Sequence, residues 1–569
     1  MTEEIYGPTL RISQEMHATK YRGEGETYGE SATRVADALS DDTSHFHAFR
    51  DIIRPQRFMP AGRVQSSAGS PRATTAYNCF VMGTIPDSMA GIMRIATEAA
   101  ETMRRGGGVG YDFSTVRPRL SRIVSMDTQS SGPVSFMNIF DAVCKTIASA
   151  GNRRGAMMAV LRVDHPDIEE FIRCKQNATE LTQFNISIGI TDEFMEAVIN
   201  DTEFELKFDG RVMKRISAVA LWDEIMRSTW DWAEPGVLFI DTINRMNNLG
   251  YCERIAATNP CAEQPLPPYG ACLLGSFNLV KYVVQGVAGN YFDYTQLRAD
   301  IPYAVRAMDN VIDRTMYPLP EQEVEAKNKR RMGIGVTGAA NAIEALGYPY
   351  GSEGFCNTLD TILDLINNEC YRASALLAAD KGAFPLFDKA HYADAPFING
   401  LDDDVQELIF THGLRNSHLT SIAPTGTISL CADNVSSGIE PVFAYEYDRT
   451  IQTVDGPIIE HIEDYGLRVF GVQGKRTQDC TIDDHLAVLE VASRHVDSAV
   501  SKTCNVDPNM PWDDFKDVYI RAWEFGAKGC TTFNPSGKRM GILNAKPASE
   551  EEQGAACYID PETGSKTCE

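Results

Sequence analysis

The sequence predicts an α/β fold with a mostly parallel sheet, because short strand candidates alternate with longer amphipathic helices. Residues 185–190, Asn-Ile-Ser-Ile-Gly-Ile, alternate strictly in polarity, and residues 237–240, Val-Leu-Phe-Ile, form a continuous apolar run. Apolar residues recur at helical spacing in four longer stretches, which are residues 87–105, 358–381, 484–502 and 513–528.

Sequence signals mark the ends of two of these helices. The helix at 87–105 begins at the capping pair Asp87-Ser88, and its apolar stripe consists of Met89, Ile92, Met93, Ala96, Ala99 and Met103. Gly382 ends the helix at 358–381, whose stripe consists of Leu359, Ile362, Leu363, Ile366, Cys370 and Leu377. Residues 1–55 are polar and predict short helices, whereas the polar and acidic stretch 546–569 predicts a flexible tail.

Composition excludes several classes of function. The net charge of -25 argues against a nucleic-acid partner, since binding a phosphate backbone needs clustered Lys and Arg. No apolar stretch approaches the roughly 20 residues that span a bilayer, and the first residues do not resemble a signal peptide. The 14 cysteines then indicate a reducing compartment, so we expect a cytoplasmic protein. No Cys-x-x-Cys pair occurs, and we expect no metal site.

The most informative segment is residues 259–272, Asn-Pro-Cys-Ala-Glu-Gln-Pro-Leu-Pro-Pro-Tyr-Gly-Ala-Cys. Its four prolines exclude a helix interior and favour extended geometry. In an extended chain Asn259, Cys261 and Glu263 project to the same side, because successive residues alternate faces. The segment is then a stiff loop that presents an amide, a thiol and a carboxylate together, with a second thiol at Cys272. Such a set suits a reaction centre, whereas the alternative is a Pro-rich surface loop with incidental cysteines.

The run from Asn259 through Leu279 closely resembles the finger loop of ribonucleotide reductase catalytic subunits, most of all the adenosylcobalamin-dependent class II enzymes. The resemblance implies a ten-stranded α/β barrel with the finger loop inside it. It also implies a division into an N-terminal helical region at 1–55, the catalytic barrel at 56–545 and a C-terminal redox tail at 546–569. No motif of the family's N-terminal ATP-binding cone is present.

The resemblance assigns roles to five residues in the reduction of ribonucleotides to 2′-deoxyribonucleotides. Cys261 would carry the thiyl radical, Glu263 would act as general base and Asn259 would orient the ribose hydroxyls. Cys79, in the context Tyr77-Asn78-Cys79-Phe80-Val81, would pair with Cys272 as the reducing thiols. By itself Cys79 is more typical of a buried core thiol.

Substrate contacts are expected from two further segments. Residues 423–429, Ala-Pro-Thr-Gly-Thr-Ile-Ser, combine small residues and hydroxyls that suit a nest of backbone N–H groups around a phosphate, although an ordinary turn is the simpler interpretation. By resemblance the substrate phosphates are held by Pro424, Thr425, Gly426, Thr427 and Ile428. Asn78 and Gly108 are expected to lie against the substrate.

Two regulatory or redox features also follow from the resemblance. Asp87 and Ser88, together with residues 151–157, resemble the site for a deoxynucleoside triphosphate effector; the alternatives are a plain helix cap and a basic surface turn. Cys557 and Cys568 in the tail would pass electrons from a thioredoxin or glutaredoxin-type protein to the internal disulfide, or they are two stray cysteines. The helix at 87–105 could pair with its copy in a homodimer.

The source of the radical distinguishes the classes of reductase. The chain contains no Tyr-Tyr pair such as class I enzymes use near the C-terminus, and residues 528–535 read Lys-Gly-Cys-Thr-Thr-Phe-Asn-Pro. Glu263 is present, unlike in class III enzymes, and no glycyl-radical motif appears. Class II therefore remains, with adenosylcobalamin as cofactor and a ribonucleoside di- or triphosphate as substrate. The alternatives are a class I large subunit that needs a radical-generating partner and a non-catalytic nucleotide sensor.

Overall fold

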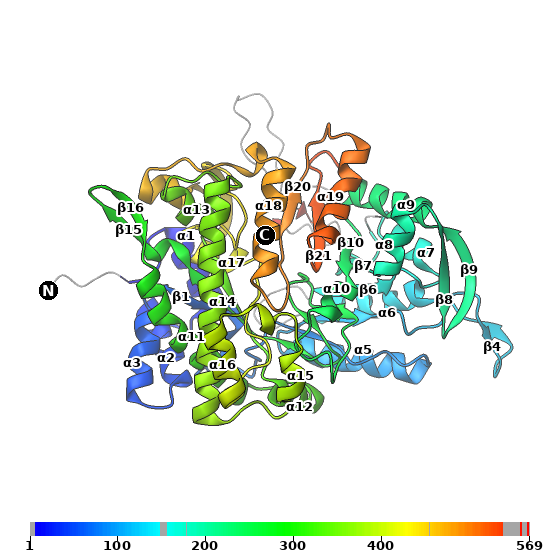
Figure 1. Cartoon of the computed structure of the whole chain (residues 1–569), viewed down its shortest axis with the longest axis horizontal. Coiled ribbons are helices and arrows are strands. Elements are labelled where there is room, and N and C mark those ends of the chain that lie inside the picture. The colour runs from blue at the N-terminus through cyan, green and yellow to red at the C-terminus, as the bar shows by residue number, and fades with distance from the viewer. Residues whose placement is uncertain are drawn as a thin grey trace.

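The computed structural model describes residues 6–147, 156–177, 179–453, 456–538, 558–559 and 566–567. Three helices form the N-terminal region, as the sequence predicts: α1 (Arg11–Tyr21), α2 (Tyr28–Leu39) and α3 (Thr43–Ile53). Thr27 begins α2 with a capping box that includes Glu30, and the Asp42 carboxylate caps α3. In Figure 1 these helices lie at one end of the molecule, on the same side as the long helix α14 (Glu353–Lys381).

The main sheet contains five neighbouring parallel strands. They are, in spatial order, β2 (Cys79–Val81), β3 (Gly108–Asp112), β6 (Met157–Arg162), β7 (Phe184–Ile190) and β10 (Gly236–Phe239). The parallel core confirms the predicted fold class, and both predicted strands are present, as β7 and β10. Antiparallel strands flank it, with β13 (Ala271–Cys272) beside β2 and β21 (Gly529–Phe533) beside β10. The outermost strand, β20 (Thr503–Asn505), is parallel to β21.

A second sheet lies across from the first and contains β1 (Phe58–Pro60), β14 (Leu274–Asn278) and β17 (Gly333–Thr337). β14 and β17 are parallel, whereas β1 is antiparallel to β14. Parallel bridges extend this sheet from Ile334 to Thr420 and from Ile422 to Val500. Only Leu273 separates β13 of the first sheet from β14 of the second, so the two sheets share a continuous chain segment.

Helices cover the outer faces of both sheets (Figure 1). Around the first sheet these are α5 (Met89–Arg104), α6 (Pro133–Thr146), α7 (Ile168–Arg173), α8 (Asp192–Ile199), α9 (Ala218–Trp232) and α19 (Trp512–Glu524). The helix α10 (Ile240–Arg245) instead packs through Ile240 and Ile243 in an interior cluster with Leu274 of the second sheet. Around the second sheet they are α4 (Gly62–Ser67), α11 (Tyr294–Arg314), α12 (Pro320–Lys329), α13 (Ala339–Ala345), α14, α15 (Lys389–Ala393), α16 (Asp403–His412), α17 (Gly426–Cys431) and α18 (Ile482–Arg494).

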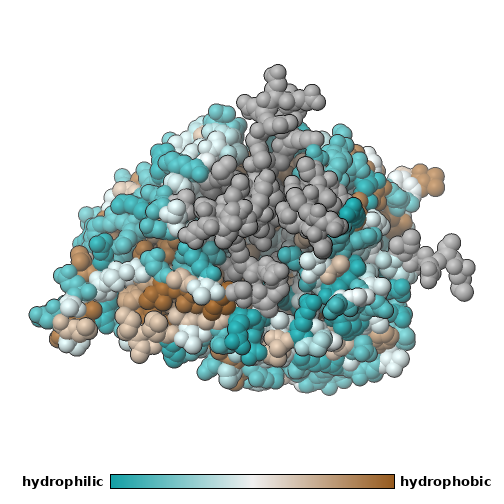
Figure 2. Space-filling view, turned by 180° about the vertical axis from the view of Figure 1, so that it is seen from behind, coloured by the Kyte–Doolittle hydropathy of each residue, from teal (hydrophilic) through white to brown (hydrophobic). Residues whose placement is uncertain are grey.

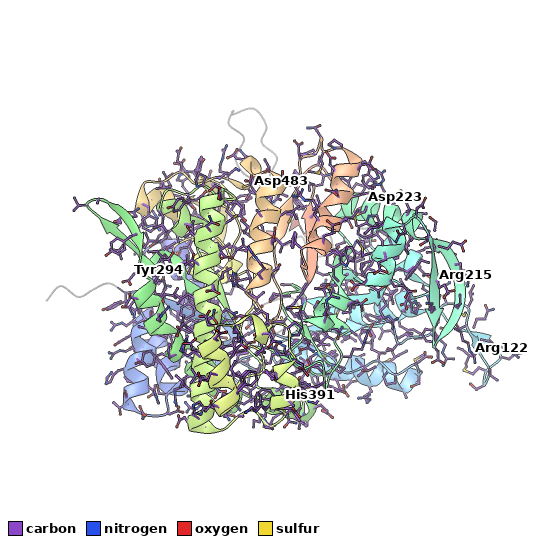
Figure 3. All side chains as sticks on the ribbon, in the orientation of Figure 1. Arg122, Arg215, Asp223, Tyr294, His391 and Asp483 are labelled. Carbon is purple, nitrogen blue, oxygen red and sulfur yellow. The ribbon has the colours of Figure 1, made fainter. Side chains whose placement is uncertain are left out.

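Short hairpins complete the described structure. They are β4 (Arg122–Ile123) with β5 (Thr128–Gln129), β8 (Glu203–Phe208) with β9 (Arg211–Ser217), β15 (Val283–Gly286) with β16 (Gly289–Phe292), β18 (Glu446–Thr453) with β19 (Gly456–Glu463), and β22 (Tyr558–Ile559) with β23 (Lys566–Thr567). Figure 3 shows Arg122 on β4 and Arg215 on β9 at the outer edge of the molecule. Within the described residues, no helix is long and apolar enough to cross a membrane.

The predicted helix at 484–502 is wrong at its C-terminal end. The helix α18 ends at Arg494, because the Asp497 carboxylate accepts hydrogen bonds from the backbone N–H groups of Leu419 and Thr420. Side-chain to backbone bonds of this kind compete with helix continuation. The chain then runs beside Ile422 as far as Val500. The other three predicted helices are confirmed as α5, α14 and α19.

The apolar stripe predicted for α5 is correct at four positions and wrong at two. Ile92, Ala96, Ala99 and Met103 are buried, but Met89 is 61% exposed and Met93 is 45% exposed. Both methionines lie at the edge of the stripe, where the helix turns from the sheet toward solvent. Figure 2 shows a hydrophobic patch over the part of the surface where α5 and α6 lie.

Candidate active site

Residues 259–264 form the tip of a hairpin between β11 (Ala257–Thr258) and β12 (Pro265–Leu266). The Ala262 N–H donates to the Asn259 carbonyl at 3.1 Å, and the Asn259 N–H donates to the Gln264 carbonyl at 3.1 Å. Ala262 adopts φ 65°. The prediction of an extended segment with one common face is therefore wrong here, because a tight turn satisfies these backbone groups instead. The turn still gathers the amide, the thiol and the carboxylate at one tip.

Apolar residues pack this hairpin between the two sheets. Ala257 and Leu266 of the hairpin belong to one buried cluster with Val81 of β2, Met158 of β6 and Leu274 of β14. Cys79 and Ala262 pack against the same cluster. The hairpin is thus an interior element that contacts strands of both sheets.

Glycines make room for the hairpin on both sides. A Cβ atom at Gly110 of β3 would overlap the carbonyl oxygen of Thr258, and one at Gly333 of β17 would overlap the Gln264 side chain. A Cβ atom at Gly108 would lie 3.2 Å from Cys79 Sγ and 3.2 Å from Pro260 Cγ. At Gly110 the two backbones approach so closely that only glycine fits.

Substitution of Gly110 by alanine is expected to displace the hairpin and to lower the free energy of unfolding by about 1–3 kcal/mol, the usual cost of overpacking. The matched control is Gly189→Ala in β7, where the nearest atoms lie 3.8 Å from the added Cβ. Denaturant unfolding of both variants checks the prediction, and equal stabilities would contradict it.

Three hydrogen bonds hold the hairpin tip in place. Asn185 Nδ2 on β7 donates to the Pro260 carbonyl at 3.0 Å. Ser421 Oγ donates to the Glu263 carbonyl at 2.9 Å, and the Ala499 N–H donates to the same oxygen at 3.0 Å. Sequence reasoning missed these anchoring residues, because each is distant in sequence and belongs to no motif.

Asn259 and Glu263 form a buried polar pair with unused hydrogen-bonding capacity. Their exposed fractions are 0% and 2%. Within the described structure, Glu263 Oε2 and Asn259 Nδ2 make no hydrogen bond of good geometry, although the Asn259 amide lies near the carboxylate. Asn259 Oδ1 accepts from the Gln264 N–H at 3.0 Å. Burial raises the pKa of Glu263 to about 7, and the Asn259 amide opposes this shift. A carboxylate with a pKa near neutrality is suited to move a proton at physiological pH, and unpaired buried polar atoms indicate a polar ligand.

Three cysteines surround this pair. Cys79 of β2 and Cys272 of β13 are directly opposite one another in the antiparallel ladder and are not disulfide-bonded. Opposed residues of such a ladder have Cα atoms about 4.5–5.5 Å apart, which suits a disulfide. Burial raises the pKa of Cys272 well above its ordinary value, and the charges of Glu263, Cys79 and Cys261 add to the effect. Cys272 is therefore a protonated thiol, whereas Cys261 is exposed at the hairpin tip.

Tyr269 connects this thiol pair to α5 and was also missed from the sequence. Its φ of 63° is a left-handed conformation that is strained for a bulky residue. The Tyr269 hydroxyl donates to Glu98 Oε2 at 3.1 Å and accepts from Arg94 at 3.3 Å. A Cβ atom at Gly83 would overlap the tyrosine ring. These contacts fix the segment that leads into Cys272.

The predicted phosphate loop lies where the chain leaves the bridge at Ile422. Thr425 adopts φ 55° and precedes the short helix α17. Its Oγ1 accepts from the Gly438 N–H at 2.6 Å and lies 3.0 Å from Thr337 Oγ1. Pro424 and Gly426 are exposed, Thr427 is half-buried and Ile428 is buried. A Cβ atom at Gly426 would meet open space, so the first turn of α17 is accessible.

Asn78 lies next to the thiol pair. Its backbone N–H donates to the Cys272 carbonyl at 3.1 Å, and its carbonyl accepts from the Gly108 N–H at 2.9 Å. Its Oδ1 is buried and has no hydrogen-bond partner among the residues that the structure describes. Gly108 and Asn78 therefore lie together beside Cys79.

The predicted effector residues have structural partners of their own. Ser88 caps α5 by accepting from the Gly91 N–H, and the Asp87 carboxylate accepts from Arg117 Nε at 2.7 Å and from its N–H at 3.1 Å. Residues 151–155 of the adjoining loop lie outside the described residues, as do Cys557 and Cys568. Among the residues that the structure describes, no group of His, Cys, Asp and Glu side chains is arranged to hold a metal ion.

A radical- or thiol-dependent oxidoreductase fits this site, since facing thiols can supply two electrons beside a carboxylate that moves a proton. The family model described as ribonucleotide reductase, barrel domain, matches residues 77–478 and 457–533. The chain belongs to the ribonucleotide reductase family.

Curated relatives agree with this assignment. The chain is 34% identical over 556 residues to the vitamin B12-dependent ribonucleoside-diphosphate reductase of Mycobacterium tuberculosis (strain CDC 1551 / Oshkosh), an alignment that covers 92% of this chain and 77% of the relative. It is 32% identical over 538 residues to the protein of the same name from Thermoplasma acidophilum, covering 89% and 67%. A ribonucleoside-diphosphate reductase subunit alpha from Chlamydia trachomatis is 25% identical over 475 residues, covering 72% and 45%.

Proposed function

We propose that this chain is a class II enzyme that reduces ribonucleotides to 2′-deoxyribonucleotides with adenosylcobalamin as cofactor. The observation that carries this proposal is the hairpin tip, where Asn259, Cys261 and Glu263 lie beside the facing thiols Cys79 and Cys272. Relatives named vitamin B12-dependent support the cofactor. Relatives named ribonucleoside-diphosphate reductases favour a diphosphate substrate.

We propose that the two sheets close into a ten-stranded barrel around the hairpin, which then corresponds to the finger loop. Five parallel strands, β2 to β10, would form one half. The other half would consist of β13–β14, β17, the strand at 420–422, the strand from 500 through β20, and β21. The antiparallel pairs β13–β2 and β10–β21 join the halves, and the bridges at Thr420 and Val500 support the closure. Residues 56–545 would form this barrel domain, between the helical region 1–55 and the redox tail 546–569.

The chemical roles follow from position and protonation. Cys261, exposed at the tip, would take the 3′-hydrogen of the ribose as a thiyl radical. Glu263 would remove the proton of the 3′-hydroxyl, and Asn259 would hold the ribose hydroxyls through its Nδ2. The thiols Cys79 and Cys272 would protonate the leaving 2′-hydroxyl and supply two electrons. The products are then water, the deoxynucleotide and one disulfide.

Adenosylcobalamin would supply the initial radical by homolysis of its cobalt–carbon bond. The exposure of Cys261 is compatible with a radical that comes from a bound cofactor, because the thiol at the hairpin tip is accessible from outside the buried cluster. The protein's own contribution is to hold Cys261, Glu263 and the substrate in fixed relation, through the anchors at Asn185 and Ser421.

The remaining assignments complete the proposal. Residues 424–428 would hold the substrate phosphates, and Asn78 and Gly108 would contact the substrate. Asp87 and Ser88 would bind a deoxynucleoside triphosphate effector. The exposed Met89 and Met93 support a homodimer through α5.

Cys557 and Cys568 would relay electrons from a thioredoxin or glutaredoxin-type protein. Serine at either position should therefore stop turnover driven by such a protein but spare turnover driven by a small dithiol.

A single-turnover experiment tests the proposed redox chemistry. The reduced enzyme, freed of dithiol, is mixed with CDP and adenosylcobalamin, quenched and digested. We expect about one dCDP per active chain and a peptide pair joined between Cys79 and Cys272, in a ratio near one. Cys144→Ser is a matched control, since that buried cysteine packs with the outer helices. Product without the disulfide, or a disulfide elsewhere in the barrel, would contradict the assignment.

A further inference from the structure

The N-terminal helix α1 and the short helix α17 are joined by a set of contacts far apart in sequence. The Asp433 carboxylate, two residues beyond the end of α17, accepts from the N–H groups of Thr9 and Leu10 at 2.7 and 2.9 Å. It also accepts from Thr9 Oγ1 at 2.9 Å. In return, Ser13 Oγ of α1 donates to the Leu430 carbonyl of α17 at 2.6 Å.

These bonds tie the start of α1 to the end of α17. The first N–H groups and the last carbonyls of a helix have no partner within it. The N-cap residue of α1, Leu10, has no capping side chain, and Asp433 binds the backbone N–H groups of Leu10 and of the preceding Thr9 from more than 400 residues away. The carbonyls of the last two residues of α17 accept side-chain hydrogen bonds. Ser13 Oγ donates to the Leu430 carbonyl, and Gln56 Nε2 donates to the Cys431 carbonyl at 3.0 Å.

The connection is buried and rigid. Ser13 is 0% exposed and Asp433 is 4% exposed. Ile12 of α1 packs with Leu430 of α17 and with Ile462. Asp433 and Asn434 both adopt left-handed conformations, with φ of 62° and 61°. Arg468 donates to the Asp433 carbonyl at 3.1 Å, and Tyr447 donates to Asn434 Oδ1 at 2.8 Å.

The other end of α17 is the predicted phosphate loop. A helix of six residues is only about 9 Å long, so a shift at its C-terminal end moves the backbone N–H groups at Gly426 and Thr427 as well. Thr425 Oγ1 and the pair Ser429 Oγ and Ser437 Oγ, at 2.9 Å, also hold this helix. Ile428 and Cys431 pack in the main hydrophobic core. The contact with α1 adds a further restraint at the C-terminal end of this short helix.

We propose that Asp433, together with Thr9, Leu10 and Ser13 of the N-terminal region, positions the phosphate loop, so that the affinity for substrate phosphates depends on the docking of α1. This inference rests on the proposed phosphate-binding role of residues 424–428. Asp433 is a positioning residue, because it acts through α17 and contacts no substrate.

Substitution Asp433→Gly tests the inference. Glycine adopts the left-handed conformation without strain and removes all three carboxylate bonds. We expect the KM for CDP to rise about tenfold, the equivalent of one lost charged cap, while kcat stays within about twofold. Asp433→Asn keeps the Oδ1 acceptor and should restore most of the affinity. Glu15→Gln is the matched control on α1, since among the described residues Glu15 pairs with the exposed Arg11 of the same helix.

Equilibrium dialysis separates the phosphate contribution from the rest. Asp433→Gly should weaken the binding of CDP but leave the binding of cytidine, which lacks phosphates, unchanged. If Asp433→Gly does not fold, Ser13→Ala serves as the second variant, with an expected loss of about threefold. Unchanged CDP binding, or an equal loss for CDP and cytidine, would overturn the inference. Failure of the wild-type chain to bind CDP would instead contradict the proposed function.

Discussion

Substitution of Cys261 by serine is expected to abolish deoxynucleotide formation while it leaves nucleotide binding and stability unchanged. Serine has nearly the same shape, and Cys261 is exposed, so little packing is lost. A hydroxyl, however, cannot take over the radical role of a thiol. Formation of dCDP in the presence of adenosylcobalamin, measured beside CDP binding by dialysis, checks both parts of this prediction.

The control for Cys261→Ser is Cys252→Ser. Cys252 is also exposed and lies nine residues earlier, outside the hairpin. This variant should keep wild-type activity. Residual turnover in Cys261→Ser above the background of heat-inactivated enzyme would rule out Cys261 as the radical-bearing residue, and loss of activity in both variants would indicate unspecific damage.

Substitution of Glu263 by glutamine is expected to lower kcat by about 10²–10⁴-fold, the usual contribution of a positioned general base. The carboxylate must be ionised to accept the proton of the 3′-hydroxyl. Because burial raises the pKa of Glu263 to about 7, wild-type kcat should rise with pH through about 7 and then level off. The variant should lack this acidic limb in a kcat profile measured from pH 5.5 to 8.5.

The raised pKa of Glu263 also makes the stability of the protein fall as the pH rises. The carboxyl has a folded-state pKa of about 7 and an ordinary value of 4.5. Its stabilising contribution is complete below the ordinary value and is lost as pH rises through the folded-state pKa. Glutamine does not titrate and avoids this loss. Between acidic and alkaline pH, the free energy of unfolding of the variant should therefore rise by about 3 kcal/mol relative to that of the wild type.

Glu344→Gln is a matched control for the pH behaviour. Glu344 of α13 is buried outside the site, and burial also raises its pKa to about 7. Its Oε1 accepts from the backbone N–H groups of Tyr350 and Lys475. This variant should change the pH dependence of stability but retain the acidic limb of kcat. Loss of the limb in Glu344→Gln, or its persistence in Glu263→Gln, would contradict the assignment of Glu263.

Local sequence signals predicted much of the fold. The helix stripe of α14 and its stop at Gly382 agree with the structure, because apolar periodicity and a left-handed glycine act within a few residues. The end of α18 could not be predicted, since it depends on Asp497 meeting Leu419 and Thr420 from elsewhere in the chain. The exposure of Met89 and Met93 likewise depends on which neighbours cover α5.

The candidate site was predictable in composition but not in geometry. The spacing of Asn259, Cys261 and Glu263 indicated a reaction centre, and the ladder places the predicted thiol pair face to face. The turn at Ala262 was not predicted, because proline spacing suggested an extended chain and gave no sign of the bond back to Asn259. The anchors Asn185 and Ser421 were also missed, since side chains that hold a backbone carbonyl carry no motif.

The central claim is that this chain reduces ribonucleotides with adenosylcobalamin and without a second radical-generating protein. The most direct test is deoxynucleotide formation by the purified chain alone, from CDP and from CTP, with a dithiol and a panel of effectors, in the presence and absence of adenosylcobalamin. The account predicts product only with the cofactor, and preferentially from CDP. Product that appears only after addition of a radical-generating subunit, and is indifferent to cobalamin, would contradict it.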